Sequence, residues 1–231
     1  MDFVTPSSVR IGVDLGARID PTALVVAEQV GDLYLVRLIE RLPLNTSYQN
    51  VAARIGYLYR RVVGRLVGEL DQDDIRDDLL TAPYMRPPND ARARGRVAIF
   101  CDATGGGIPA TEIIRDHPDL EGAMITGVFI TSGEHCTVKP GVREGSVGKA
   151  HLVGRLQSLL QPPARIELPP TSEAAALREE LRDYEIHRNE SDGRLTAGVF
   201  KVGKHDDMAT ALGLAVLIDR THHTCGTQRY A

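Results

Sequence analysis

This sequence of 231 residues has no long apolar run, few cysteines and no excess of basic residues. Because no apolar stretch reaches the roughly 18 residues of a membrane-spanning helix, we expect no membrane contact. The first ten residues lack the basic start and apolar stretch of a secretory signal. The cysteines are too few and too scattered for a disulfide framework, which fits a reducing cytoplasm: Cys101, Cys136 and Cys225.

The charge balance argues against a protein that binds nucleic acid through basic residues alone. Acidic residues outnumber basic residues by 31 to 27, which gives a net charge of −4. Pure nucleic-acid binders usually carry a basic surface, because neutralising phosphates drives much of their affinity. A metal-dependent nuclease tolerates an acidic balance, since its carboxylates hold cations that in turn meet the phosphate.

The spacing of apolar residues predicts an α/β fold. Alternation and short apolar runs predict strands over residues 9–15, 22–30, 33–41, 96–102 and 124–131. Helical spacing predicts helices over residues 47–67, 109–116, 146–160, 172–183 and 205–219. A β-hairpin in the C-terminal half is predicted for residues 185–189 and 195–201. This order predicts a mixed central sheet with helices on both faces.

We expect a single domain over residues 1–231, with a core over about residues 9–220. Residues 71–95 interrupt the apolar pattern with charges, prolines and small residues. Because the strand that follows belongs with the earlier strands, we interpret this segment as a surface insertion rather than a domain boundary. The segment 132–145 is predicted to be a loop, because glycines and a proline punctuate it.

Four acidic residues stand at the ends of predicted elements, where the active site of a sheet protein would form. Asp14 ends the first strand, Asp102 ends the fourth, and Asp206 with Asp207 opens the last helix. If the first and fourth strands are neighbours, Asp14 and Asp102 lie side by side and the helix delivers its acids to the same place. Taken singly, each acid is equally well explained as a strand-end or helix-start residue.

A carboxylate cluster of this kind repels itself and is costly without cations. Oxygen ligands suit Mg²⁺ or Mn²⁺ better than zinc. Two such ions about 3.5–4 Å apart can activate a water and stabilise the leaving oxygen of a phosphodiester. The acids therefore predict a centre for phosphodiester hydrolysis that uses two divalent cations.

The segments around these acids follow a recognisable pattern. Ile11–Gly16 is followed by Asp20-Pro-Thr-Ala-Leu-Val-Val, and Phe100–Gly105 is an apolar strand that ends in Asp-Ala-Thr-Gly. Gly148–Leu152 opens a leucine-rich helix, and Lys204–Ala211 contains the triplet His-Asp-Asp. In order and spacing, these segments resemble the motifs of the nuclease domain of large terminase subunits from tailed bacteriophages, a member of the ribonuclease-H-like superfamily.

The resemblance implies a ribonuclease-H-like fold and an endonuclease that cuts concatemers of double-stranded viral DNA during genome packaging. It assigns Asp14, Asp102 and either Asp206 or Asp207 as the catalytic metal ligands. The cofactors would be two Mg²⁺ or Mn²⁺ ions. Asp207 follows Asp206 directly, so the pattern does not decide which of them is the main ligand.

Two further residues enter through the same motifs. Asp20 would be an auxiliary acid near the site, although a turn residue before a proline explains it equally well. His205 would orient a ligand or the DNA phosphate, and a role in capping the last helix is an equal alternative.

The resemblance also implies partners: double-stranded DNA, a packaging ATPase domain or subunit, the portal and the small terminase subunit. They would meet in the cytoplasm of the infected bacterial host. A complete large terminase has a phosphate-binding loop, and the best segment for one, Gly141–Ala150, fails because Arg143 and Ala150 replace required residues. We therefore expect an excised domain or a separately encoded nuclease subunit.

Other functions remain open from the residues alone. The Asp-x-Gly opening and the glycine-rich turn after Asp102 also occur in phosphotransferases of the actin and sugar-kinase class. A Holliday-junction resolvase would share the fold and chemistry, and a non-catalytic scaffold fits poorly with four acids. A zinc site at His222, His223 and Cys225 is not favoured, because adjacent histidines point in opposite directions on an extended segment. A solvated face is the commoner explanation for a further group, which could instead form a DNA-facing surface: Arg60, Arg61, Arg65, Arg92, Arg94 and Arg96.

Overall fold

A computed structural model describes the chain at residues 8–16, 20–67, 91–183, 185–188, 195–198 and 206–219. Several residues considered above lie outside this described part: His205, His222, His223, Cys225 and most of the 71–95 insertion.

The central sheet has seven strands in the order β6-β5-β4-β1-β2-β3-β7. Their bounds are Ser8–Asp14 (β1), Ala23–Val30 (β2), Leu33–Arg41 (β3), Val97–Asp102 (β4), Met124–Thr131 (β5), Glu144–Gly148 (β6) and Ile166–Glu167 (β7). β1, β2 and β3 form an antiparallel meander, whereas β4, β5 and β6 run parallel to β1. The sheet is mixed, as predicted, and the first and fourth strands are neighbours.

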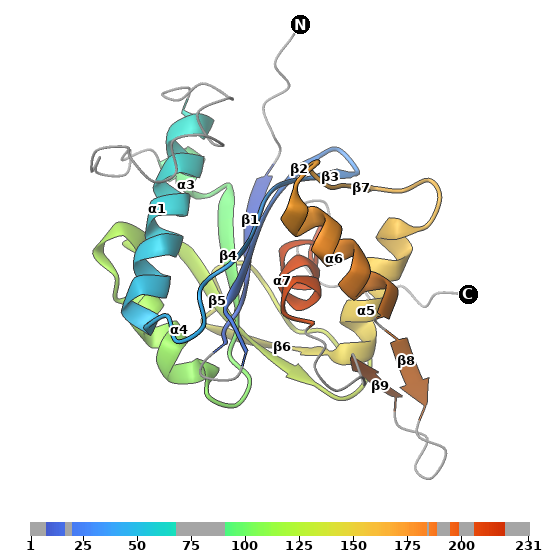
Figure 1. Ribbon diagram of the computed structural model, residues 1–231. Coiled ribbons are helices and arrows are strands. Elements are labelled where there is room, and N and C mark those ends of the chain that lie inside the picture. The colour runs from blue at the N-terminus through green and yellow to red at the C-terminus, as the bar shows by residue number, and fades with distance from the viewer. Residues whose placement is uncertain are drawn as a thin grey trace, which may run out of the picture.

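Helices cover both faces of this sheet (Figure 1). On one face lie α1 (Tyr48–Leu66), α3 (Ala91–Arg94), α4 (Gly107–Arg115) and the short 3₁₀ helix η1 (Pro118–Leu120). On the other lie α5 (Lys149–Leu160), α6 (Ser172–Asp183) and α7 (Asp207–Ala215). The predicted hairpin is present as β8 (Glu185–Arg188) and β9 (Leu195–Gly198), which pair antiparallel.

Each face of the sheet has its own core. Ile11 and Val13 of β1 pack with the apolar face of α1. On the opposite face α7 is buried along its whole length, as a helix that is apolar all round must be. Because side chains alternate along a strand, Gly12 and Asp14 point to the face that α7 covers. The sheet therefore turns one acid of the candidate site towards α7.

Residues 144–148 form strand β6, which corrects the loop predicted over residues 132–145. The helix predicted to begin at residue 146 begins at Lys149 instead. Glycine explains the error, because it signals a turn in the sequence but here allows close packing. A Cβ on Gly148 would lie 1.9 Å from the carbonyl oxygen of Gly133. The strand can therefore lie against a neighbouring backbone only with glycine at that position.

Two of the six arginines considered as a DNA-facing surface, Arg60 and Arg65, are engaged within the protein. Arg60 pairs with buried Asp119 at 3.2 Å, and Arg65 pairs with buried Glu28. The arginine side chains are only 14% and 10% exposed. Their charges therefore compensate internal acids and are not presented to a partner.

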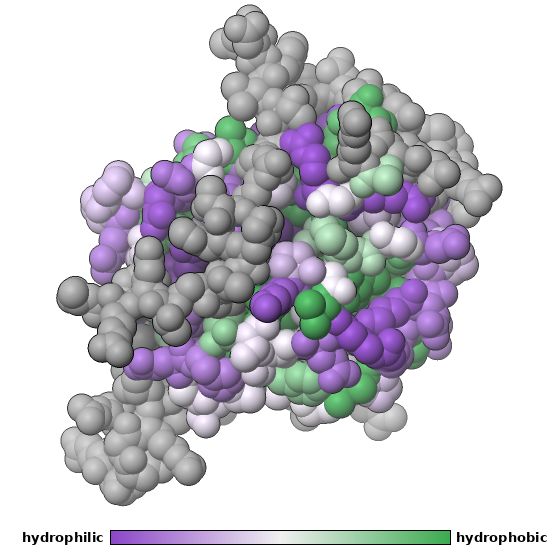
Figure 2. Space-filling model, turned by 180° about the vertical axis from the view of Figure 1, so that it is seen from behind, coloured by the Kyte–Doolittle hydropathy of each residue, from purple (hydrophilic) through white to green (hydrophobic). Residues whose placement is uncertain are grey.

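Among the described residues, few large apolar side chains are exposed. They are Leu44, Ile108 and Val142. Figure 2, which views the molecule from behind, shows hydrophilic and hydrophobic residues interspersed over that face. No helix within the described ranges is long and apolar enough to cross a membrane.

The cysteines have two different environments. Cys101 on β4 is a free thiol with no exposed surface, and burial raises its pKa to about 12. Cys136 takes part in a disulfide, which the scattered cysteines of the sequence did not predict.

Candidate active site

Asp14 and Asp102 lie side by side at the carboxyl ends of neighbouring parallel strands. β1 and β4 pair with Val13 opposite Cys101, so the next residue on each strand is an acid. The carboxyl ends of parallel strands meet at one edge of the sheet, where α/β proteins form their sites. The structure thus brings together two of the acids that the sequence placed at strand ends.

Asp206 and Asp207 reach the same edge through α7. The helix begins at Asp207, with Asp206 in the N-cap position. It packs so closely on β1 that a Cβ on Gly12 would lie 2.0 Å from the carbonyl oxygen of Ala211. Because Gly12 and Asp14 point to the same face of β1, this contact brings the N-terminus of α7 over Asp14.

A cavity of about 690 Å³ opens at this edge. The charged residues that line it are Asp14, Asp20, Asp102, Asp206, Asp207 and Lys149. Five acids and a single lysine therefore face one cavity among the described residues. Such a surface attracts cations and repels a bare phosphate.

Mutual repulsion among these acids is visible in the pKa of Asp14. Burial raises that pKa well above its usual value, and the charges of Asp102, Asp207, Asp206 and Asp20 raise it further. Ionisation of Asp14 is therefore opposed both by burial and by the acids around it. A bound cation would reverse this effect, because it favours the charged form.

The pKa of Asp102 is raised for a similar reason. Burial is the main cause, and the negative charge of Asp206 adds to it. Hydrogen bonds from Thr104 act in the opposite direction, as does the positive charge of Lys149. One of these bonds runs from the Thr104 backbone N–H to Oδ1 of Asp102 over 2.8 Å, and it fixes the carboxylate at the strand end.

The two acids of α7 differ in their surroundings. Asp206 is 34% exposed and lies 3.5 Å from the ammonium group of Lys149. Asp207 is 4% exposed, and its Oδ2 accepts a hydrogen bond from Nε of Arg41 at 3.0 Å. The sequence treats these neighbours alike, whereas the structure separates an open carboxylate from an enclosed one.

These carboxylates surround the cavity without converging on one point. Among the residues that the structure describes, no group of three His, Cys, Asp or Glu side chains is close enough to hold an ion as it stands. In this arrangement Asp206, Asp207 and Asp102 are each engaged by a different partner, namely Lys149, Arg41 and the Thr104 amide. A shared ion therefore requires rotation of at least one carboxylate towards the cavity.

Lys149 stands in the Gly148–Leu152 motif, which assigns it no role. The residue begins α5 directly after the parallel strand β6, so it lies at the same sheet edge as Asp14 and Asp102. A strand predicted directly before Lys149 would have placed this residue at the sheet edge. Strand β6 was not predicted, because its glycines are typical of a loop.

Arg41 and Glu180 were missed entirely. Arg41 ends β3 and forms ion pairs with both Asp207 and Glu180. Glu180 lies on α6, 8% exposed, and burial raises its pKa to about 7. The charges of Asp207 and Asp206 also raise that pKa, while the Ala209 amide and Arg41 lower it. No local motif marks these residues, because the fold brings them together from distant positions.

The auxiliary residues have different outcomes. Asp20 is exposed and lines the same cavity, and its charge contributes to the raised pKa of Asp14. His205 lies outside the described residues, so its predicted role stays a prediction.

Comparison with solved structures identifies the fold. The large terminase nuclease of thermophilic phage G20c superposes with a TM-score of 0.53 at 18% identity, over 90% of this chain and 80% of the other. A magnesium-bound structure of that nuclease gives 0.51 at 17% identity, with 91% and 80% covered. The manganese-soaked human cytomegalovirus terminase nuclease domain gives 0.52 at 11% identity, with 96% and 88% covered.

A longer chain gives a similar match. The large terminase of another thermophilic bacteriophage, solved in complex with ATP-gamma-S, gives a TM-score of 0.52 at 9% identity, over 91% of this chain and 40% of the other. No family model and no curated protein sequence matches the chain. At these identities the likeness establishes the fold, and the predicted ribonuclease-H-like architecture is confirmed.

Proposed function

Because the chain has the fold of large-terminase nuclease domains, we propose that it is a metal-dependent endonuclease that cleaves double-stranded DNA concatemers during viral genome packaging. The observation that carries this proposal is the meeting of Asp14, Asp102, Asp206 and Asp207 around one cavity. These acids come from two strand ends and one helix start, so the fold itself assembles them. Two of the similar structures, the phage G20c nuclease and the cytomegalovirus nuclease domain, were solved with magnesium and manganese, which supports the use of divalent ions.

The acids fit a hard divalent cation. Every donor that they offer is an oxygen, which suits Mg²⁺ or Mn²⁺. The raised pKa of Asp14, caused by burial and by four neighbouring carboxylates, is the strain that such an ion would relieve. We propose two ions, with Asp14 between Asp102 on one side and Asp206 or Asp207 on the other.

When bound, the ions would supply water activation and charge stabilisation at the phosphodiester. The residues supply the placement of those charges. Asp14 and Asp102 are fixed by adjacent strands, and Asp206 and Asp207 by a helix buried on all sides. Lys149 provides a positive charge beside Asp206, where it is suited to contact a phosphate oxygen.

The partners follow from the same proposal. We infer that double-stranded DNA binds at the acidic cavity through divalent ions rather than through a basic surface. We also propose that the domain works with a packaging ATPase domain or subunit, the portal and the small terminase subunit, in the cytoplasm of the infected bacterial host. The match to 40% of the longer large terminase, the one solved with ATP-gamma-S, supports the first of these partners.

Plasmid cleavage tests the proposal. Purified protein is incubated with supercoiled plasmid and Mn²⁺ or Mg²⁺, with EDTA as a control. We expect metal-dependent nicking and linearisation, abolished in Asp102→Asn and in EDTA. Asp32→Asn is the matched control, because Asp32 is an exposed acid in the turn between β2 and β3, at the opposite end of these strands.

Normal cutting by Asp102→Asn would reject the site assignment. Absence of cutting by the wild-type protein with either metal, together with nucleotide binding by the same sample, would favour the phosphotransferase alternative instead.

A further inference from the structure

Helix α7 lacks a cap from its own N-cap residue. Helices leave their first backbone N–H groups without partners, and an N-cap Asp usually accepts from the second or third of them. Asp206 stands in that position and forms no such bond. Its carboxylate instead lies beside Lys149 in the acidic cavity.

Glu180 of the neighbouring helix α6 supplies the missing cap. Its Oε2 accepts a hydrogen bond from the backbone N–H of Ala209 over 2.9 Å. Ala209 is the third residue of α7, whose N–H an N-cap side chain would normally satisfy. A buried carboxylate at this position also interacts favourably with the helix dipole. The cap of α7 therefore comes from another helix.

Arg41 joins this cap to the second acid of α7. Its guanidinium group forms an ion pair with Oε1 of Glu180 and donates from Nε to Oδ2 of Asp207 at 3.0 Å. Glu180 and Asp207 are almost fully buried, and Arg41 is 32% exposed. The arginine thus holds two acids that would otherwise repel each other.

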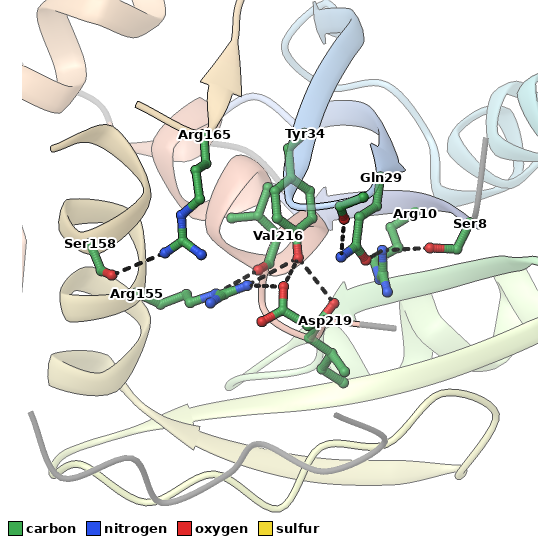
Figure 3. Close-up of polar contacts among 11 residues, drawn as sticks. Ser8, Arg10, Gln29, Tyr34, Arg155, Ser158, Arg165, Val216 and Asp219 are labelled. Atoms are coloured by element: carbon green, nitrogen blue, oxygen red, sulfur yellow. Dashed lines mark hydrogen bonds and ion pairs between the residues drawn. The ribbon is translucent and has the colours of Figure 1, made fainter. Parts of the chain in front are cut away.

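The opposite end of α7 is held by a separate cluster (Figure 3). Arg155 donates from Nε to the carbonyl oxygen of Val216, which follows the last turn, at 3.1 Å. It also pairs with Asp219, which accepts a hydrogen bond from the Tyr34 hydroxyl group. Because α7 is anchored at its far end, a change at Glu180 acts locally on its first turn.

We propose that Glu180 and Arg41 are positioning residues for the acids at the start of α7. Glu180 caps the helix in place of Asp206, which leaves the Asp206 carboxylate available to the cavity, and Arg41 fixes the orientation of Asp207. The inference rests on the proposed function, because it assigns these residues to the same divalent-ion site. It adds to that site a supporting pair from β3 and α6.

The test is Mn²⁺ binding by titration calorimetry with the full chain. Glu180→Ala removes both acceptor oxygens, so Asp206 is expected to turn back and cap its own helix. Residues that orient metal ligands typically change affinity on the order of 10- to 100-fold, and we expect a loss in this range. Glu180→Gln keeps one acceptor oxygen and should lose less, as should Arg41→Lys relative to Arg41→Ala.

Glu179→Ala is the matched control, because Glu179 is the preceding residue of α6 and is 68% exposed. It should bind Mn²⁺ as the wild-type protein does. Cleavage provides a second measurement. Saturating Mn²⁺ should restore most of the activity of Glu180→Gln, since the defect lies in ion placement. Because a bound ion also stabilises a destabilised protein, thermal unfolding without metal is measured for the same variant.

The outcomes separate the two proposals. If the wild-type protein binds no Mn²⁺, the metal site of the proposed function is wrong. If the wild-type protein binds Mn²⁺ and cuts DNA, but the folded Glu180 and Arg41 variants, alanine substitutions included, bind like Glu179→Ala, only the positioning role is wrong. Thermal unfolding of each variant shows which samples are folded.

Discussion

Gly12 of β1 lies directly beneath Ala211 of α7, at a separation that admits no side chain. A Cβ at position 12 would lie 2.0 Å from the Ala211 carbonyl oxygen and 2.7 Å from the backbone nitrogen of Ala215. Backbone atoms of a buried helix cannot move aside as a flexible side chain can. The contact therefore fixes how far α7 stands from the strand that carries Asp14.

Gly12→Ala is expected to lower the free energy of unfolding by at least about 1–3 kcal/mol, the usual range for overpacking a core. It should also weaken Mn²⁺ binding, because it lifts Asp206 away from Asp14. Urea denaturation and calorimetry measure the two effects. Gly154→Ala is the matched control: nothing lies within 4 Å of a Cβ there, so it should stabilise α5 by about 0.5–1 kcal/mol. Equal effects of both substitutions would contradict the close contact.

Asp14→Asn should make the metal-free protein more stable at pH 7 while it abolishes cleavage. The substitution removes a carboxylate whose pKa is raised well above its usual value by burial and by its acidic neighbours, and each unit of such a shift corresponds to about 1.4 kcal/mol. Urea denaturation in EDTA measures the gain. Asp32→Asn, in an exposed turn, should leave stability nearly unchanged. A less stable Asp14→Asn would show that the acid is structural.

Asp219 is expected to stabilise the protein above about pH 4 and to lose this effect in acid. Burial alone would raise the pKa of Asp219, but hydrogen bonds and charge from Tyr34 and Arg155 lower it below its usual 3.8. A lowered carboxyl pKa contributes stability above the unfolded value, which is lost as the pH falls through the folded value. Asp219→Asn should therefore cost about 1–3 kcal/mol at pH 7 and progressively less as the pH falls below 3.8. Urea denaturation at pH 7, 5 and 3 measures this, and a constant difference would refute it.

The sequence predicted the parts of the site that depend on local signals. Asp14 and Asp102 each end an apolar strand, so their positions followed from periodicity. Because β1 and β4 are neighbours in the sheet, the two acids lie side by side. The start of α7 was equally visible, because a nearly all-apolar segment follows Asp207. These features depend on residues close to one another in the chain.

The parts that were missed depend on contacts between distant residues. Glu180 reaches Ala209 across 29 positions, and Arg41 reaches Asp207 across 166. Neither residue differs in its local sequence from an ordinary surface charge, so only the packed fold reveals its partner. Strand β6 was missed for a related reason, because Gly148 acts through a contact with Gly133 that periodicity does not report.

Because α7 is buried on all sides, the candidate site can form only when folding is complete. The helix that brings Asp206 and Asp207 to the cavity is also central to one of the two cores, so the acids cannot assemble before that core closes. A chain still being synthesised contains Asp14 and Asp102 long before it contains α7. Under the proposed function, such an unfinished chain would be harmless to the DNA around it.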